Sequence, residues 1–241
     1  MLVDSHCHLD FPDFANDLDA IVARAEAAGV GRIVTISTRV RRIESLLAIT
    51  ARFPNVYCSV GTHPHNADEE DGITSDELIA LTKHPKVVAL GEAGLDNFYK
   101  DGSPEAQERG FRAHIAAARA TGLPLVIHTR EADEACGRIL EDEIAKGPFK
   151  AVLHCYTGGR DLAMKAVALG LSVSFTGILT FKNSQAIRDI AAELPADRIM
   201  VETARVLAET RGVSLDEIAQ QTTENFFRLF DKVPRPDAKA A

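Results

Sequence analysis

Two histidines stand two positions apart near the start of the chain. The first ten residues read MLVDSHCHLD, in which His6 and His8 follow a short apolar run. In a β-strand, residues i and i+2 face the same side, so both imidazoles can point into one site while Cys7 points away. Two imidazoles on one face are typical of a metal site, although this pattern alone is a weak signal.

Polar side chains also follow four other runs that read as buried strands. These are His63 and His65 in GTHPH, Glu92 and Asp96 in GEAGLD, His128 and Arg130 in IHTR, and His154 in LHCYTGG. Six of the eight histidines therefore lie at predicted strand ends. Imidazole and carboxylate are ligands that suit Zn²⁺, Mn²⁺ and similar ions. Because apolar strands seldom hold an unpartnered histidine, this joint occurrence predicts one metal site.

Glu92 lies on a central strand with histidine pairs before and after it, so its carboxylate is the candidate bridge between two ions. Each histidine also has a simpler interpretation. His63 precedes a proline and could cap a loop, and His128 and His154 could be hydrogen-bonded core residues. His84 and His114 fall in helical stretches and are expected to be structural or solvent-facing.

The elements that would position these residues alternate along the chain. β-rich runs are predicted at 2–9, 31–38, 56–64, 87–96, 123–130, 150–159, 171–179 and 198–203, and amphipathic helices at 18–29, 41–53, 103–122 and 183–194. Gly29, Gly122 and Gly170 are placed to end helices. Eight strands alternating with helices predict an α/β fold, a single-domain (β/α)₈ TIM barrel.

We expect the barrel to span residues 1–231, with an extra C-terminal helix, and 232–241 to form a flexible tail. The alternative is a doubly wound open sheet. Such a sheet usually carries a glycine-rich phosphate loop after its first strand, where this chain reads HCHLDFPDF.

Composition limits the classes of partner. The formal net charge is −8, and a nucleic-acid binder usually shows a basic patch, so a nuclease would need bound cations to reverse the local field. The sequence has no run of about 18 apolar residues, so we expect no membrane span, and no signal peptide is evident. The spacing of the four cysteines fits no zinc finger, so we expect reduced thiols and a cytoplasmic protein.

Several segments resemble the TatD family of metal-dependent deoxyribonucleases, in the order that the family has them. They are DSHCHLD, GTHPHNA, GEAGLDNFY, PLVIHTREA, LHCYTGG, FTGILTFKNS and SLDEIAQQTTENFFRLF. The resemblance implies a (β/α)₈ barrel with two divalent ions, Zn²⁺, Mg²⁺ or Mn²⁺. It implies the following roles: one ion on His6 and His8, the other on His128 and His154, Glu92 as the bridge, and His63 near the substrate phosphate.

Two further residues are candidates for substrate contact. Arg130 follows a ligand histidine, and its fork of donors could hold a phosphate, although an arginine on the rim is often only solvated. Tyr156 could stack on a base, although a core tyrosine is the alternative.

The chain departs from the family at the eighth strand. The family has Glu-Thr-Asp there, with a metal-binding Asp and then a long loop rich in proline and basic residues. Here Glu202 and Thr203 are followed by Ala204 and a helical stretch of about two turns. Either the chain has lost the loop, or the natural protein carries residues that the printed sequence lacks. We favour the second explanation, which an intact mass matching these 241 residues would contradict.

The expected reaction is metal-dependent hydrolysis of single-stranded DNA from its 3′ end, with RNA as a further substrate. Two ions would clamp the phosphate and activate water. Glu92, His63 and Glu202 are the expected catalytic residues, with Glu202 replacing the missing Asp as base. The alternatives are an ester, lactone or amide hydrolase, such as a D-aminoacyl-tRNA deacylase, and a non-catalytic metal-binding relative. We expect a monomer.

Overall fold

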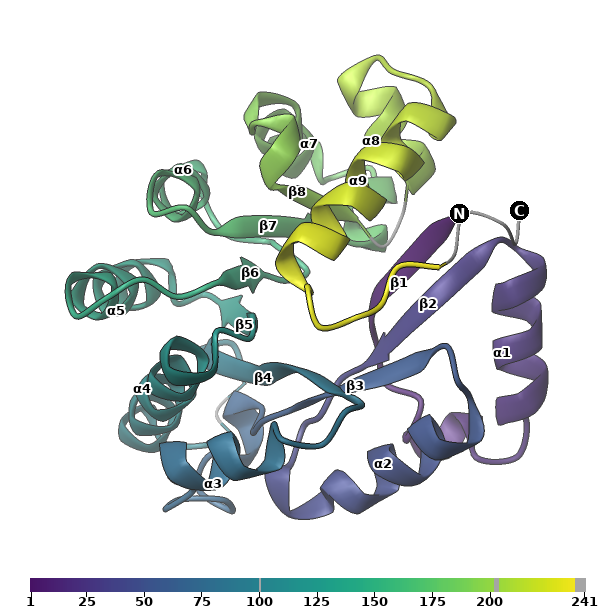
Figure 1. The fold of residues 1–241 in the computed structure, drawn as a ribbon. Helices are drawn as coiled ribbons and strands as arrows, with labels where there is room; N and C mark the ends of the chain where they lie inside the picture. Colours follow the sequence, from purple (N-terminus) through teal and green to yellow (C-terminus); the bar gives the residue numbers. More distant parts are fainter. Residues whose placement is uncertain (100, 202–203, 237–241) are drawn as a thin grey trace.

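Eight parallel strands follow one another around a nearly closed barrel in the computed structural model, which describes residues 1–99, 101–201 and 204–236 (Figure 1). The strands are β1 (Leu2–Cys7), β2 (Val30–Thr35), β3 (Val56–Val60), β4 (Val87–Asp96), β5 (Leu125–Arg130), β6 (Ala151–Leu153), β7 (Ser172–Phe175) and β8 (Ile199–Val201). Each strand pairs with the next in the sequence, from β1 to β8. The predicted (β/α)₈ fold is confirmed.

Helices alternate with the strands and surround the barrel (Figure 1). They are α1 (Leu18–Ala27), α2 (Ile43–Arg52), α3 (Ser75–Leu81), α4 (Pro104–Thr121), α5 (Asp133–Ala145), α6 (Arg160–Ala168), α7 (Gln185–Glu193), α8 (Ala204–Arg211) and α9 (Leu215–Leu229). The helix ends follow local chemistry. Gly122 ends α4 at φ +72°, a conformation that glycine adopts without strain, and Ser214 with Glu217 forms a capping box at the start of α9.

Strand β4 is the longest strand, and all ten of its residues are buried. Its apolar run packs between the outer helices and the barrel interior, as strands of a parallel sheet do. Near its end, β4 passes very close to β5: a Cβ on Gly94 would lie 1.9 Å from the His128 carbonyl oxygen. This glycine therefore allows the segment that carries Glu92 and Asp96 to lie directly beside the strand that carries His128.

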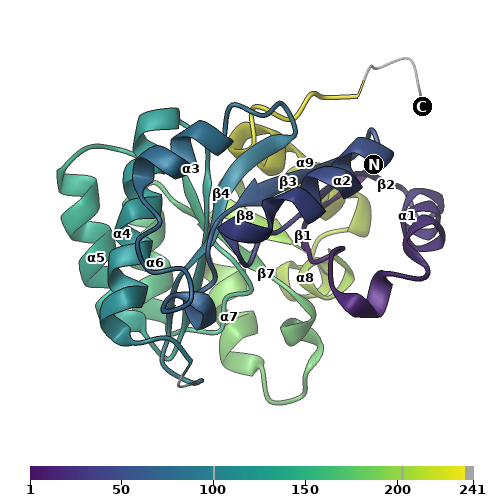
Figure 2. The same cartoon turned by 90° about the horizontal axis from the view of Figure 1, so that it is seen from below.

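Helix α9 closes one end of the barrel (Figure 2). Its rings Phe226, Phe227 and Phe230 form a cluster with side chains from the starts of the strands, such as Val88 and Val126. The prediction of an extra C-terminal helix is confirmed. Because this end is packed, the opposite mouth, at the carboxyl ends of the strands, is left for the site.

The chain beyond α9 remains packed against the barrel as far as it is described. Val233 is buried, and the Lys232 ammonium donates hydrogen bonds to the carbonyl oxygens of Thr82, His84 and Val87. The packed part of the chain thus extends beyond the boundary at residue 231 that the sequence predicted, and residues 237–241 lie outside the described residues.

Helix α8 begins at Ala204, directly after the two residues that follow β8. The helix ends at Arg211, in agreement with the helical stretch of about two turns that the sequence predicted after the eighth strand. Glu202 and Thr203 themselves lie outside the described residues.

Within the described part of the chain, no helix combines the length and the apolar character needed to cross a bilayer.

Candidate metal centre

The polar side chains at the strand ends converge on one pocket of about 1070 Å³. Its lining includes His8, His63, Glu92, His128 and His154. These side chains come from β4 and β5 and from the segments that follow β1, β3 and β6, and a parallel barrel brings these strand ends to one mouth. The structure therefore brings together the side chains that the sequence singled out.

One carboxylate oxygen of Glu92 faces the two histidines at the start of the chain. Glu92 Oε2 lies 3.3 Å from His6 Nε2 and 3.8 Å from His8 Nε2, and the two nitrogens are 3.3 Å apart. Because three potential ligand atoms lie this close together, the three residues form a candidate ion site.

The other oxygen of Glu92 faces a second set of imidazoles. Glu92 Oε1 lies 3.0 Å from His128 Nδ1, 2.6 Å from His154 Nε2 and 3.6 Å from His63 Nε2. Glu92, His63 and His128 meet the spacing of a second candidate site. His154 stacks on His6, with ring centroids 3.9 Å apart and planes inclined by 3°, so it lies between the two sets. Each oxygen of one carboxylate thus faces its own imidazole cluster.

The buried polar atoms at this centre fit divalent cations. Among the described residues, Glu92 Oε2 and His6 Nδ1 have no hydrogen-bond partner although both atoms are buried. A buried carboxylate oxygen without a donor is costly, and a cation at the cluster would satisfy it. The donor set of imidazole and carboxylate is one that Zn²⁺ and Mn²⁺ accept.

The hydrogen bonds that His8 and His63 make through Nδ1 indicate whether the Nε2 atom, which faces the pocket, carries a proton or a lone pair. His8 Nδ1 lies 3.1 Å from the Ile36 carbonyl oxygen, an acceptor, so Nδ1 carries the proton and Nε2 is available as a ligand. His63 is the opposite case, because its Nδ1 accepts the backbone N–H of His65 at 3.2 Å. In the neutral ring, His63 Nε2 therefore carries the proton and acts as a donor towards the pocket.

His63 also caps the short helix that begins at Pro64, so the loop-cap interpretation and a place in the site hold together. Since the Nε2–H of His63 is a donor, this ring is better suited to donate to an acceptor oxygen in the pocket than to ligate an ion.

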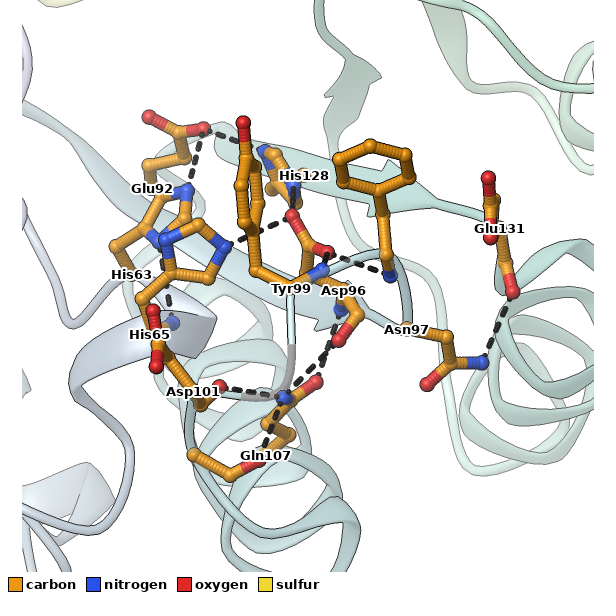
Figure 3. Close-up of polar contacts among 12 residues, drawn as sticks. His63, His65, Glu92, Asp96, Asn97, Tyr99, Asp101, Gln107, His128 and Glu131 are labelled. Carbon is orange, nitrogen blue, oxygen red and sulfur yellow. Dashed lines mark hydrogen bonds and ion pairs between the residues drawn. The ribbon is translucent and has the colours of Figure 1, made fainter.

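Asp96 is a site residue to which sequence reasoning assigned no role. Its Oδ2 lies 2.8 Å from His128 Nε2 and 2.9 Å from His65 Nε2, and its side chain is fully buried (Figure 3). Gln107 on α4 holds the same residue by accepting its backbone N–H. Asp96 orients His128 so that Nδ1 faces Glu92, as carboxylates beside metal-binding histidines do. The available signal was its position four residues after Glu92, on the same face of β4.

Electrostatics keep Glu92 ionised and two of the imidazoles neutral. Burial raises the pKa of Glu92, but interactions with His154, His6 and His128 outweigh it, so the pKa lies well below its ordinary value. Burial lowers the pKa of His6 to about 4 and that of His63 to about 3. Burial also lowers the pKa of His128, but its hydrogen bonds to Glu92 and Asp96 raise it above the ordinary value. An anionic carboxylate among neutral imidazoles is the protonation state that ion binding requires.

The remaining predicted site residues are placed differently from one another. Arg130 lines the pocket. Tyr156 is fully buried, with its hydroxyl bonded to the Gly159 carbonyl oxygen and its ring against Phe175. It therefore offers no exposed face to a base, because the β6 end turns this ring into the core. Glu202, the candidate base, lies outside the described residues.

Comparison with known proteins identifies the family. The profile of the family described as TatD related DNase matches residues 3–204. The metal-dependent hydrolase YcfH of Escherichia coli K12 is 35% identical over 255 residues, covering 95% of both chains. The 3′-5′ ssDNA/RNA exonuclease TatD of Enterobacter lignolyticus is 37% identical over 203 residues, covering 84% of this chain and 78% of that protein.

A solved structure has the same fold. The crystal structure of YjjV, a TatD homologue from Escherichia coli K12, superposes with a TM-score of 0.86 at 29% identity, covering 95% of this chain and 98% of that chain. The match to YcfH spans 255 positions, more than the 241 residues of this chain, so that relative has positions without a counterpart here. The chain belongs to the TatD family of metal-dependent hydrolases.

Proposed function

We propose that this hydrolase cleaves phosphodiester bonds of single-stranded nucleic acid, releasing nucleotides from the 3′ end, with a two-ion centre at Glu92. The observation that carries the proposal is the position of the Glu92 carboxylate, whose two oxygens face two separate imidazole clusters. A carboxylate shared by two ligand clusters would suit a centre of two adjacent divalent ions, a kind of centre that phosphatases and nucleases use. The relatives named 3′-5′ ssDNA/RNA exonuclease support the choice of substrate.

The two ions would be divided between the clusters. His6 and His8 would hold one ion together with Glu92, and His128 and His154 would hold the other together with the same carboxylate. When bound, divalent ions such as Mg²⁺, Mn²⁺ or Zn²⁺ supply positive charge that polarises a phosphoryl oxygen and lowers the pKa of water.

The chain's own residues bind and orient the substrate. His63 offers its Nε2–H to a phosphate oxygen or to the leaving group, and Arg130 offers a second, charged donor group from the rim. Asp96 keeps His128 in the rotamer that faces Glu92. The part of the base is assigned to Glu202.

The test of this proposal uses metal-free protein and single-stranded DNA labelled at its 3′ end, with Mg²⁺, Mn²⁺ or Zn²⁺ added back. We expect metal-dependent release of nucleotides. E92Q keeps the shape of the side chain but removes the charge shared by both clusters, so the rate should fall by more than the roughly 10- to 100-fold loss typical of a missing outer hydrogen bond.

A second test variant and a control variant accompany E92Q. The test variant His6→Ala should also abolish release and should lower the number of ions bound, as measured by elemental analysis. His84→Ala removes an exposed histidine distant from the pocket and should leave both quantities unchanged. Full activity of E92Q, or no release from the wild type with any of the three ions, would contradict the proposal.

A further inference from the structure

Two exposed phenylalanine rings stand at the mouth of the pocket, after different strands. Phe11 follows β1 and is 39% exposed, and Phe98 follows β4 and is 48% exposed. Both rings line the same pocket as Glu92. Because β2 and β3 separate β1 from β4, the rings stand at separate positions around the mouth. A single exposed ring needs no explanation, but two that line one polar pocket do.

Phe98 and Tyr99 form a cluster that holds the Arg130 guanidinium through its positive charge but does not neutralise that charge. The Arg130 guanidinium carbon lies 3.9 Å from the centre of the Phe98 ring and 4.9 Å from that of Tyr99. Within residues 1–99, 101–201 and 204–236, no carboxylate forms an ion pair with Arg130. Cation–π contact fixes the guanidinium in place and leaves its charge for an anion from outside.

The backbone of this cluster is anchored to the metal centre. Asp96 Oδ1 accepts the backbone N–H of Phe98 at 2.9 Å. It also accepts that of Tyr99 at 3.0 Å, while Oδ2 of the same carboxylate faces His128 (Figure 3). The position of the Phe98 ring is therefore tied to that of His128, on the Oε1 side of Glu92.

Phe11 has the corresponding position on the other side. Its ring stacks on His8, with centroids 4.7 Å apart and planes inclined by 16°. His8 belongs to the cluster at Glu92 Oε2. Each imidazole cluster thus has a partly exposed phenyl ring beside it.

We propose that Phe98 and Phe11 are two base-stacking subsites, on the His128 side and the His8 side of Glu92, for the unpaired nucleobases that flank the scissile phosphate. Arg130 contacts a phosphate oxygen beside Phe98. The assignment rests on the proposed function and deepens it, because stacking needs base faces that a duplex does not expose. It replaces the stacking role predicted for the buried Tyr156.

The charge of the pocket favours stacking over long-range attraction. Glu131 and Asp133 also line it, and the chain carries a net charge of −8, so this is not a basic groove for a polyanion. Stacking on an aromatic ring is independent of that charge and tolerant of sequence.

The experiment compares two single strands of equal length and phosphate number, one with normal bases and one with tetrahydrofuran residues in their place. Phe98→Leu and Phe11→Leu keep an apolar side chain and remove the aromatic face. Each should lower kcat/KM on the base-bearing strand by about tenfold to a hundredfold, mainly through KM. Phe11→Leu should leave the base-free strand unchanged, whereas Phe98→Leu also removes the ring that holds Arg130 and should lower kcat/KM on the base-free strand by clearly less than on the base-bearing strand. Phe181→Leu is the matched control, because Phe181 is 60% exposed but is not among the described lining residues of the pocket.

A binding measurement separates this inference from the proposed function. Strands with 2-aminopurine at the 3′ end are titrated with wild type and Phe98→Leu in Ca²⁺, and fluorescence quenching reports stacking. Equal losses on both strands, together with quenching that does not depend on Phe98, would overturn the subsites. If the wild type cleaves neither strand with Mg²⁺, Mn²⁺ or Zn²⁺, the proposed function fails, and Phe98-dependent quenching alone then decides whether the subsites stand.

Discussion

At the scale of single residues, two buried carboxylates divide the work of the site. Glu92 faces both imidazole clusters, whereas Asp96 does not line the pocket and holds His128 and His65 through one oxygen. The first is placed to hold charge, and the second is placed to fix the direction of a ring. A histidine with its outer nitrogen bonded to a carboxylate presents the inner nitrogen in one tautomer.

Asp96→Asn should therefore weaken ion binding without unfolding the barrel. The amide has one acceptor oxygen and no charge, so it cannot accept from the two imidazoles through one oxygen and from the backbone N–H groups of Phe98 and Tyr99 through the other, as the carboxylate does. We expect the affinity for Mn²⁺ or Zn²⁺ to fall by about 10- to 100-fold, measured by calorimetric titration. The ¹⁵N shifts of His128 should report a changed tautomer.

The control is Asp71→Asn, which removes an exposed carboxylate paired with Arg109 and should leave metal affinity unchanged. If Asp96→Asn bound ions as tightly as the wild type, Asp96 would have no positioning role.

At the scale of elements, a buried histidine joins helix α4 to the segment after β3. His114 Nε2 accepts the backbone N–H of Thr62 at 3.2 Å, and Nδ1 lies 2.7 Å from the Gly110 carbonyl oxygen. The bond from Thr62 requires an unprotonated Nε2, so the two bonds form together only in the neutral ring, and burial lowers its pKa from 6.5 to about 4. The sequence expectation that His114 is structural agrees with these contacts.

The lowered pKa of His114 predicts a pH dependence of stability. As pH falls below about 6.5, His114 becomes protonated in the unfolded chain, whereas in the folded protein it becomes protonated only near pH 4. The neutral His114 ring therefore contributes up to about 3 kcal/mol to the free energy of unfolding. This contribution is complete above pH 6.5 and is lost progressively between pH 6.5 and pH 4. Urea unfolding at pH 7.0 and 4.5 should show this loss in the wild type and a smaller one in His114→Gln, which does not titrate. An equal loss in both proteins would exclude His114 as its source.

At the scale of the whole molecule, the two ends of the barrel have different tasks. Helix α9 lies at the amino ends of the strands (Figure 2). Its rings pack this end, whereas the carboxyl ends surround the candidate metal centre. Such a division lets the site vary without loss of the core. The net charge of −8 is likewise a property of the whole surface, and the centre can still attract phosphate when cations are bound.

Phe230→Ala tests this division. The ring is fully buried and stacks on Phe226, with centroids 4.6 Å apart. Its loss should cost about 3–5 kcal/mol and lower the melting temperature. Metal-dependent activity measured well below that temperature should stay within about twofold of the wild type, because the cavity forms at the far end of the barrel. A large fall in kcat with unchanged stability would contradict the division.

Local pattern was sufficient to locate the strands, several helix ends and the candidate ligands. Short apolar runs, glycines at helix ends and histidines at strand ends are patterns of residues close together in the chain, and the sequence displays them directly. The barrel followed from eight alternations, since parallel strands require crossovers.

Contacts between distant segments were needed for the rest. Asp96 gains its role from His65 and His128, which are 31 and 32 positions away, and the donor character of His63 depends on which ring nitrogen the backbone occupies. Tyr156 and Phe98 are both aromatic residues after strands, yet one ring turns into the core and the other into the pocket. Rotamer and burial are decided by packing against elements remote in the chain, so local spacing carries no record of them.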